Sequence, residues 1–275
     1  MRIFILFAGT MLPSMLAAQA PQKGRIELLW GWNRDTYSNS DIRFRGNGYD
    51  FTLHDVRATD RPTPVSVEYL NPVKLTIPQT NLRINYAFAE HWAAGIAFDH
   101  MKYVMVQDQQ VRMTGSLPPE AGPPVADGDG RVTLSREFLT YEHTDGLNFV
   151  NARLERRDRL ASVRVLRMEL SSALGASVGA LVPRTACRFN GNMLSDDYHL
   201  SGSGAGLSAA VRITFFERLV LSAEGHGGRI WMPDVRTTND PSDRASQAFW
   251  FAEAVVMFGA SFPLVRQPGA NQTEP

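Results

Sequence analysis

One short stretch of the chain gathers the residue types that general acid–base chemistry uses. Glu142, His143, Thr144 and Asp145 are consecutive, so a histidine stands beside two carboxylates and a hydroxyl. Such a histidine can act as the general base of an ester hydrolysis, with a hydroxyl as the nucleophile. The alternative is a polar bend in a long strand, with Gly146 supplying the kink. The bend is favoured, because neighbouring residues of a regular strand point to opposite faces.

Charged residues of both signs recur at alternate positions of several apolar runs. Because alternate residues of a strand share a face, we expect these side chains to meet inside a closed barrel and pair there. Glu224 and His226, two residues apart, could form a proton relay, but a structural ionic network is the favoured interpretation. The predicted interior network consists of Glu27, Arg83, Asp99, Arg153, Arg167, Glu169, Arg212, Glu224, His226 and Glu253.

A second polar group lies at the end of one predicted strand. Asp99, His100 and Lys102, together with His143, could form a rim that faces lipopolysaccharide phosphates or a metal ion. The histidines and carboxylates lack the regular spacing of a metal site, and hydrogen bonding at the membrane surface is favoured. We therefore expect no metal ion and no cofactor.

The elements that position these residues are β-strands. Apolar side chains occupy every second position over long stretches, which is the pattern of a strand with two different faces. These runs lie near residues 26–33, 82–88, 92–99, 166–182, 207–213, 219–226 and 250–262. Beyond the N-terminal segment there is no run of 18 apolar residues.

The connections between the runs are alternately tight and long. Tight connections lie near 89–91 and 216–218 and a modest one near 156–161, whereas 34–80, 106–135, 184–196 and 233–246 are long and polar. If Glu137–Arg156 is one bent strand, this order gives eight strands with both termini at the tight end. An even number of strands with short periplasmic turns and long outer loops is typical of outer-membrane barrels.

The stretch Asp41–Val56 also alternates, around a turn at Gly46-Asn47-Gly48. It is interpreted as an extracellular hairpin within the first long loop. If it crosses the membrane instead, ten strands become possible. The fold class is therefore all-β, an antiparallel up-and-down transmembrane β-barrel with eight strands or, alternatively, ten.

Alternation is also compatible with a soluble, lipocalin-like barrel whose apolar face points inward. Three features favour the membrane: charges of both signs on the polar face, small residues on that same face, and aromatic residues near the ends of the runs. The aromatic residues are Trp30, Trp32, Tyr86, Phe88, Trp92, Phe215, Phe216, Trp231, Phe258 and Phe262.

The N-terminal residues have the features of a secretory signal. Arg2 precedes an apolar stretch that ends at Ala17, and cleavage is expected after Ala18 or Ala20. A permanent membrane anchor is the alternative. The predicted organisation is a signal peptide at 1–20, a barrel at 21–265 and a flexible tail at 266–275. Cys187 is the only cysteine, and we expect a buried, inert thiol.

Lys and Arg together number 28, as do Asp and Glu, so the formal net charge is zero. A nucleic-acid partner is not expected, because binding phosphates requires a concentrated basic surface. The expected partners are outer-membrane lipid and lipopolysaccharide.

The patterns described above resemble those of small outer-membrane β-barrel proteins of Gram-negative bacteria. The closing run Phe249–Leu264 resembles the C-terminal strand that the barrel-insertion machinery recognises. The stretches Trp30–Asn33, Asp99–Tyr103 and Glu142–Asn148 resemble those of a family of such barrels that has no assigned activity. The resemblance implies a location in the bacterial outer membrane.

The surroundings of His143 are also similar to the His-x-Ser-Asn stretch of outer-membrane lipid A deacylases. Those enzymes use a serine two residues after the histidine, and Asp145 occupies that position here. The leading hypothesis is therefore a structural or surface-binding barrel. The alternatives are an outer-leaflet lipid-modifying hydrolase and a soluble exported ligand-binding barrel.

Overall fold

The computed structural model describes residues 22–64, 66–70, 79–117, 126–127, 130–165, 167–189, 192–195 and 197–264. The predicted signal peptide at 1–20 and the predicted tail at 266–275 lie outside these residues. Among the described residues, no helix is long and apolar enough to cross a bilayer.

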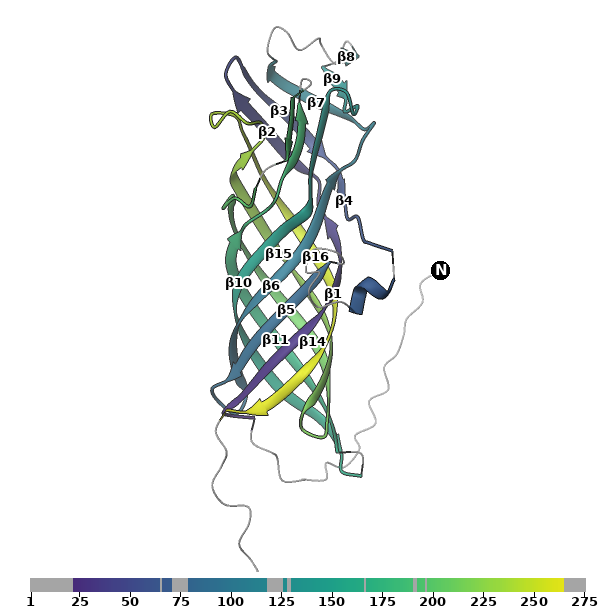
Figure 1. Cartoon of the computed structure of the whole chain (residues 1–275), viewed down its shortest axis with the longest axis vertical. Helices are drawn as coiled ribbons and strands as arrows, with labels where there is room; N and C mark the ends of the chain where they lie inside the picture. Colours follow the sequence, from purple (N-terminus) through teal and green to yellow (C-terminus); the bar gives the residue numbers. More distant parts are fainter. Residues whose placement is uncertain are drawn as a thin grey trace, which may run out of the picture.

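Eight long antiparallel strands form a closed barrel (Figure 1). Each strand pairs with the next in chain order, and the ring closes where Arg25 lies opposite Pro263. This confirms the eight-stranded prediction. The strands are β1 (Arg25–Tyr37), β5 (Thr80–Ala87), β6 (Trp92–Met105), β10 (Leu139–Val163), β11 (Met168–Leu181), β14 (Gly202–Phe215), β15 (Leu219–Arg236) and β16 (Arg244–Pro263).

Short connections lie at one end of the barrel, where β1 also begins and β16 ends (Figure 1). The predicted hairpin near 156–161 is wrong, because β10 continues to Val163 and the turn spans 164–167. The predicted long connection at 233–246 is shorter than expected. Pairing between β15 and β16 continues up to Arg236 and Arg244, so both strands rise above the rest of the wall.

The long connections form a second, smaller β-structure beyond the barrel. The hairpin predicted at Asp41–Val56 is confirmed as β2 (Ser40–Gly46) and β3 (Tyr49–Val56), with its turn at 47–48. It does not enter the ring, because β2 pairs only with the upper end of β16 and β3 pairs with β7. The other short strands there are β7 (Gln110–Ser116), β8 (Ala126–Asp127), β9 (Arg131–Thr133), β12 (Ala186–Phe189) and β13 (Asn192–Ser195).

The segment between β3 and β5 extends the wall and then crosses its outer surface. β4 (Ala58–Thr59) pairs with β6 above the end of the short strand β5. The chain then forms the 3-10 helix η1 (Val67–Leu70), whose Tyr69 ring lies 5.6 Å from that of Trp32 on β1. The Arg34 guanidinium donates a hydrogen bond to the Tyr69 hydroxyl at 3.0 Å, which holds the segment against the barrel.

β10 is one bent strand, as predicted. Its register with β6 shifts between His143 and Leu147, which marks a bulge. Gly146 has a φ of 136°, a left-handed conformation that favours glycine. The bulge lets the upper and lower parts of β10 each keep alternate residues directed inward.

The two faces of the wall have opposite character. Leu28, Ile96 and Val256 point outward and are 45%, 61% and 60% exposed, whereas Glu27 and Asp99 point inward and are buried. The prediction that apolar side chains face lipid is therefore confirmed, and the lipocalin-like alternative is wrong. The barrel interior is polar toward the short turns and apolar toward the long connections, where Phe149, Phe249 and Phe251 join a large hydrophobic core.

Candidate functional site

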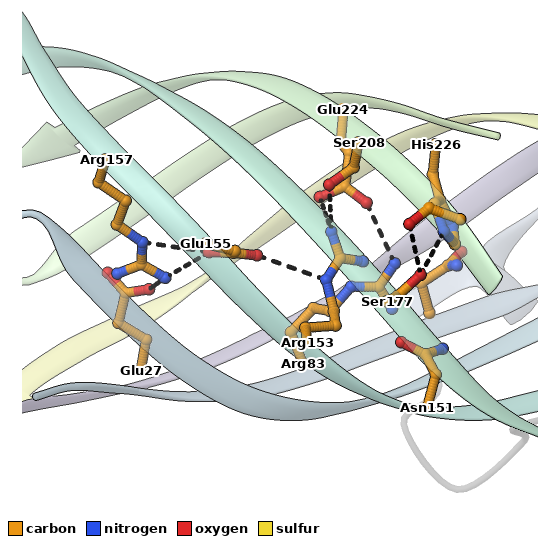
Figure 2. Close-up of polar contacts among 12 residues, drawn as sticks. Glu27, Arg83, Asn151, Arg153, Glu155, Arg157, Ser177, Ser208, Glu224 and His226 are labelled. Carbon is orange, nitrogen blue, oxygen red and sulfur yellow. Dashed lines mark hydrogen bonds and ion pairs between the residues drawn. The ribbon is translucent and has the colours of Figure 1, made fainter. Parts of the chain in front are cut away.

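The polar part of the interior contains a continuous chain of ion pairs, here called the ionic ladder. Carboxylates and guanidiniums alternate along it, so each inner member contacts two groups of opposite charge (Figure 2). The successive pairs are Asp99–Arg83 (2.5 Å), Arg83–Glu224 (3.4 Å), Glu224–Arg153 (2.9 Å), Arg153–Glu155 (3.4 Å), Glu155–Arg157 (2.8 Å), Arg157–Glu27 (2.9 Å) and Glu27–Arg212 (2.6 Å).

The ladder balances its own charge. Its four carboxylates face four guanidiniums, and all eight side chains are almost completely buried. Burying an unpaired charge costs several kcal/mol, so this pairing makes a filled ionic interior tolerable.

A fifth buried carboxylate, Glu253, has a histidine as its partner. His226 Nδ1 lies 2.8 Å from Glu253 Oε2, and His226 Nε2 lies 3.0 Å from Ser177 Oγ. This order of serine, imidazole and carboxylate is that of a nucleophile activated by a general base. Here, however, the imidazole packs against the wall, since a Cβ added to Gly206 would lie 2.6 Å from Nε2. Ser177 and His226 are both buried in the barrel interior.

One group of described residues brings metal-ligating atoms together. Donor atoms of Asp99, His226 and Glu253 all lie within 4.8 Å of one another. The direct His226–Glu253 contact of 2.8 Å is that of a hydrogen bond, so these two atoms already have each other as partners.

Most residues of the predicted network lie in the interior. Glu169 lies at the barrel mouth, where its carboxylate pairs with Arg159 at 3.0 Å. Arg167 requires a correction: it lies in the β10–β11 turn, its side chain is 63% exposed, and it pairs with Glu217 at 3.7 Å. The reason is the greater length of β10, which moves the turn to Arg167. The residues inside are Glu27, Arg83, Asp99, Arg153, Arg212, Glu224, His226 and Glu253.

Two ladder members, Glu155 and Arg157, were missed from the sequence. They continue the inward positions of β10 beyond Arg153 in steps of two, a signal that was available. The hairpin predicted near 156–161 ended the strand too early and hid them. Three buried amides were also missed, although polar side chains at inward positions could have indicated them: Asn81 and Asn151 donate to Asp99, and Asn33 donates to Glu253.

The weak catalytic candidates do not converge. The His143 imidazole is fully buried within the apolar core, beside the rings of Tyr103 and Tyr141, and its Nδ1 contacts Thr185 Oγ1 at 3.1 Å. The Thr144 hydroxyl donates to Glu142 instead. Asp145 is exposed and pairs with Arg184 at 3.2 Å. No lipid-facing base and nucleophile are assembled from these four residues.

The predicted polar rim is also divided between two faces. Asp99 points inward into the ladder, whereas His100 and Lys102 are on the outer face of β6. The segment after β4 covers Lys102, whose Nζ donates to Thr63 Oγ1 at 3.1 Å. His100 Nδ1 lies 2.8 Å from Asn148 Oδ1. The alternation of the strand separates Asp99 from its neighbours.

Beyond the barrel, the outward side chains of β2, β3 and β7 form a polar surface, here called the outer platform. Arg43 makes two hydrogen bonds to the Asp50 carboxylate, at 2.8 and 2.5 Å. The His54 ring bridges Asp41 Oδ2 at 3.0 Å and Thr114 Oγ1 at 2.8 Å. The three strands are thus joined by side chains as well as by their backbones.

Electrostatics fix the charge of this surface. Partial burial acts to raise the pKa of Asp41, but hydrogen bonds from the Asp55 backbone and the His54 ring outweigh it and hold that pKa below its usual range. A hydrogen bond from Arg43 lowers the pKa of Asp50. Both carboxylates are therefore ionised at neutral pH.

Aromatic residues on the outer wall mark its two boundaries. At the short-turn end, the exposed rings are those of Tyr86, Phe88, Trp92, Phe216 and Phe262. Toward the other end lie Trp231 and Trp250, and the Arg229 guanidinium is 5.6 Å from the Trp250 ring centroid. A closed barrel with an apolar outer face between two aromatic girdles is the structure of a bacterial outer-membrane strand barrel. The chain is an outer-membrane β-barrel protein.

Comparisons with known proteins found similar solved structures at low sequence identity. No family model and no curated protein matches the chain. It is similar to the outer membrane protein OprG of Pseudomonas aeruginosa, at 11% identity and a TM-score of 0.41, covering 88% of this chain and 99% of OprG. It is also similar to Ail of Yersinia pestis, at 13% identity and a TM-score of 0.29, covering 87% and 99%.

The barrel orientation follows from its two ends. Short turns of such barrels face the periplasm and long connections face the outside. The ionic ladder therefore lies toward the periplasm, and the apolar core and outer platform lie on the extracellular side.

Proposed function

We propose that this barrel is a surface-binding protein that holds the outer platform outside the cell and conducts no solutes. The observation that carries the proposal is the filled interior. The ladder and the Ser177–His226–Glu253 chain occupy its lower part, and the hydrophobic core occupies its upper part. An eight-stranded barrel is just wide enough for side chains, which supports the same conclusion.

The strands of the outer platform pack on a hydrophobic core, which fixes their positions as a binding surface requires. On the inward side of β2 and β3, the rings of Phe44 and Phe51 stack 5.2 Å apart. The Phe189 ring of β12 lies 5.4 Å from that of Phe51, so the hairpin packs onto the far side of the barrel top. β2 also continues the sheet of β16 through backbone pairing.

The outward side chains of the platform suit a hydrophilic partner. Arg43, Arg45 and Arg112 alternate with Asp41 and Asp50, and all five are exposed. Mixed charges of this kind set the orientation and specificity of a partner rather than supplying a large apolar contact.

Two further partners follow from the barrel as a whole. The exposed Trp231 and Trp250 rings and Arg229 suit the outer-leaflet interface, where lipopolysaccharide phosphates lie. The closing strand β16 ends with the outward aromatic ring of Phe262, which suits recognition by the barrel-insertion machinery.

A conductance measurement tests the closed interior. The purified barrel, inserted into planar bilayers, is expected to give no steady ion current, because the ladder and the apolar core fill the lumen. A stable, reproducible single-channel current in the unmodified protein would contradict the proposal.

Site-specific photocrosslinking on intact cells tests the platform. A photoreactive amino acid at Arg112 is expected to give a discrete adduct. The same amino acid at Tyr198, which is exposed on the β11–β14 connection, serves as the matched control. Equal labelling from both positions, or no adduct at Arg112, would refute a binding role for this surface.

A further inference from the structure

The periplasmic end of the barrel is hollow, in contrast to the rest of the interior. A cavity of about 300 Å³ lies below the ladder and is lined by the lower ends of β1, β10, β11, β14 and β16. This cavity is here called the periplasmic cup. Its volume is at the lower limit of sites that hold small molecules.

The described lining of the cup is strongly basic. Six arginines reach it: Arg25, Arg157, Arg159, Arg164, Arg167 and Arg212. Three glutamates oppose them: Glu27, Glu169 and Glu217. Arg157 and Arg212 are already balanced within the ladder by Glu27 and Glu155. The other four arginines of the cup face only Glu169 and Glu217, which leaves two positive charges in excess among the described lining residues.

The arginines at the top of the cup are held in place. Arg157 and Arg212 are both almost fully buried, and both pair with Glu27, at 2.9 and 2.6 Å. Fixed guanidiniums lose little freedom when a ligand arrives, which favours binding. They form the inner end of the cavity, and their positions are fixed before a ligand binds.

Arg25 supplies charge that the described residues do not neutralise. Its Nε donates to Ser261 Oγ at 3.0 Å, and its Nη2 donates to the backbone carbonyls of Ser261 and Glu217. These acceptors are neutral oxygens. Within the part of the chain that the structure describes, no ion pair involves Arg25.

We propose that the periplasmic cup binds a small anion that carries at least two phosphate-type negative charges. The guanidinium fork matches the oxygens of a phosphate, and several forks around one cavity select a multiply charged ligand over a single carboxylate. The phosphates belong either to a soluble periplasmic anion or to the headgroup of an inner-leaflet phospholipid that carries two phosphates. This site lies at the opposite end of the barrel from the outer platform and does not depend on it.

Calorimetric titration of the purified barrel with inorganic pyrophosphate, in zwitterionic detergent at low salt, tests the proposal. The wild-type protein is expected to bind pyrophosphate, and acetate is expected to bind far more weakly. Arg25→Gln is expected to weaken pyrophosphate binding by roughly tenfold or more, since it removes a charged hydrogen-bond donor. Arg25 lies outside the ladder, and retained heat-modifiable gel migration verifies the fold.

Arg156→Gln is the matched control. Arg156 lies on β10 close to Arg157, but it points outward and pairs with Asp158 at 3.0 Å. It should leave pyrophosphate affinity unchanged. Absence of binding by the wild-type protein at millimolar pyrophosphate would overturn the proposal, as would equal loss of affinity in Arg25→Gln and Arg156→Gln.

Nanodiscs distinguish the two sources of phosphate. If a lipid headgroup occupies the cup, discs containing cardiolipin, whose headgroup carries two phosphates, will weaken pyrophosphate binding relative to discs of phosphatidylcholine alone. If the ligand is soluble, the wild-type affinity will be the same in both, and Arg25→Gln will weaken it in both.

Discussion

At the scale of single residues, each buried charge of the ionic ladder lies next to a charge of opposite sign. Each arginine of the ladder contacts at least one carboxylate within 3.0 Å, and the charges alternate from Asp99 to Arg212. Such a chain loses more when one member is neutralised than an exposed pair does, because the remaining partner stays buried. The exposed pairs at the barrel ends carry no such penalty.

Glu224→Gln tests this difference. The substitution leaves Arg83 and Arg153 without a shared carboxylate, and we expect the free energy of unfolding to fall by roughly 3–5 kcal/mol. Asp145→Asn, which breaks the exposed pair with Arg184, is the control and should cost about 1 kcal/mol or less. Urea unfolding in lipid vesicles measures both. Equal costs would contradict it.

Cys187 gives a second test at this scale. The thiol is buried within the extracellular core, and burial raises its pKa to about 12. The reactive thiolate is therefore nearly absent at pH 8, and a maleimide should label the folded barrel only after denaturation. Thr114→Cys in a Cys187→Ser chain should react at once, because position 114 is exposed. Rapid labelling of native Cys187 would contradict its burial.

At the scale of elements, strand alternation decides which side chains meet, and glycines decide how closely they pack. Gly206 of β14 points inward and lies against the His226 ring of β15, whereas Gly225 of β15 points outward into open space. A methyl group added at Gly206 would therefore meet a neighbouring side chain, whereas one added at Gly225 would not.

Gly206→Ala and Gly225→Ala form a matched pair. At Gly206 a Cβ would lie 2.6 Å from His226 Nε2, so the ring must shift away from Ser177, at an expected cost of roughly 1–3 kcal/mol. At Gly225 nothing lies within 4 Å of the added atom, and stability should not fall. Unfolding midpoints of the two variants provide the measurement. An unchanged unfolding midpoint in Gly206→Ala would show that the close packing of Gly206 against His226 does not contribute to stability.

At the scale of the whole molecule, the direction in which apolar side chains point differs between the lower and the upper part of the barrel. Within the membrane, apolar residues face outward and charges face inward; above it, Phe44 and Phe51 face inward while Arg43 and Asp50 face water. Where lipid surrounds the wall, the apolar side of each strand faces outward. Where water surrounds it, the apolar side faces inward.

Leu207→Arg tests the lipid-facing wall. Leu207 is 71% exposed near the middle of β14, and an arginine there should cost about 2–4 kcal/mol in a bilayer. Gln110→Arg, on an exposed position of β7, should cost almost nothing because water solvates it. Comparison of unfolding in vesicles detects the difference, and similar values for the two variants would argue against membrane burial at Leu207.

The sequence by itself determined the period of two, the eight strands, the hairpin at β2–β3 and the outward direction of the apolar side chains. The first three follow from local rules, because alternation and turn composition are properties of consecutive residues. The outward direction rested on the charges and small residues of the polar face and on the aromatic residues near the run ends. The end of β10 was misplaced because Arg156–Arg159 is polar on both faces, so no local pattern shows that pairing with β11 continues to Val163.

Only the tertiary structure decided which charges meet. The ladder joins Glu27, Arg157 and Arg212 from β1, β10 and β14, which lie far apart in the sequence. The contact between Lys102 and the segment after β4, and the burial of His143 beside Tyr103 and Tyr141, likewise join residues that no local pattern connects. Such contacts depend on the stagger of the closed ring, which fixes the height of every residue and which no single strand encodes.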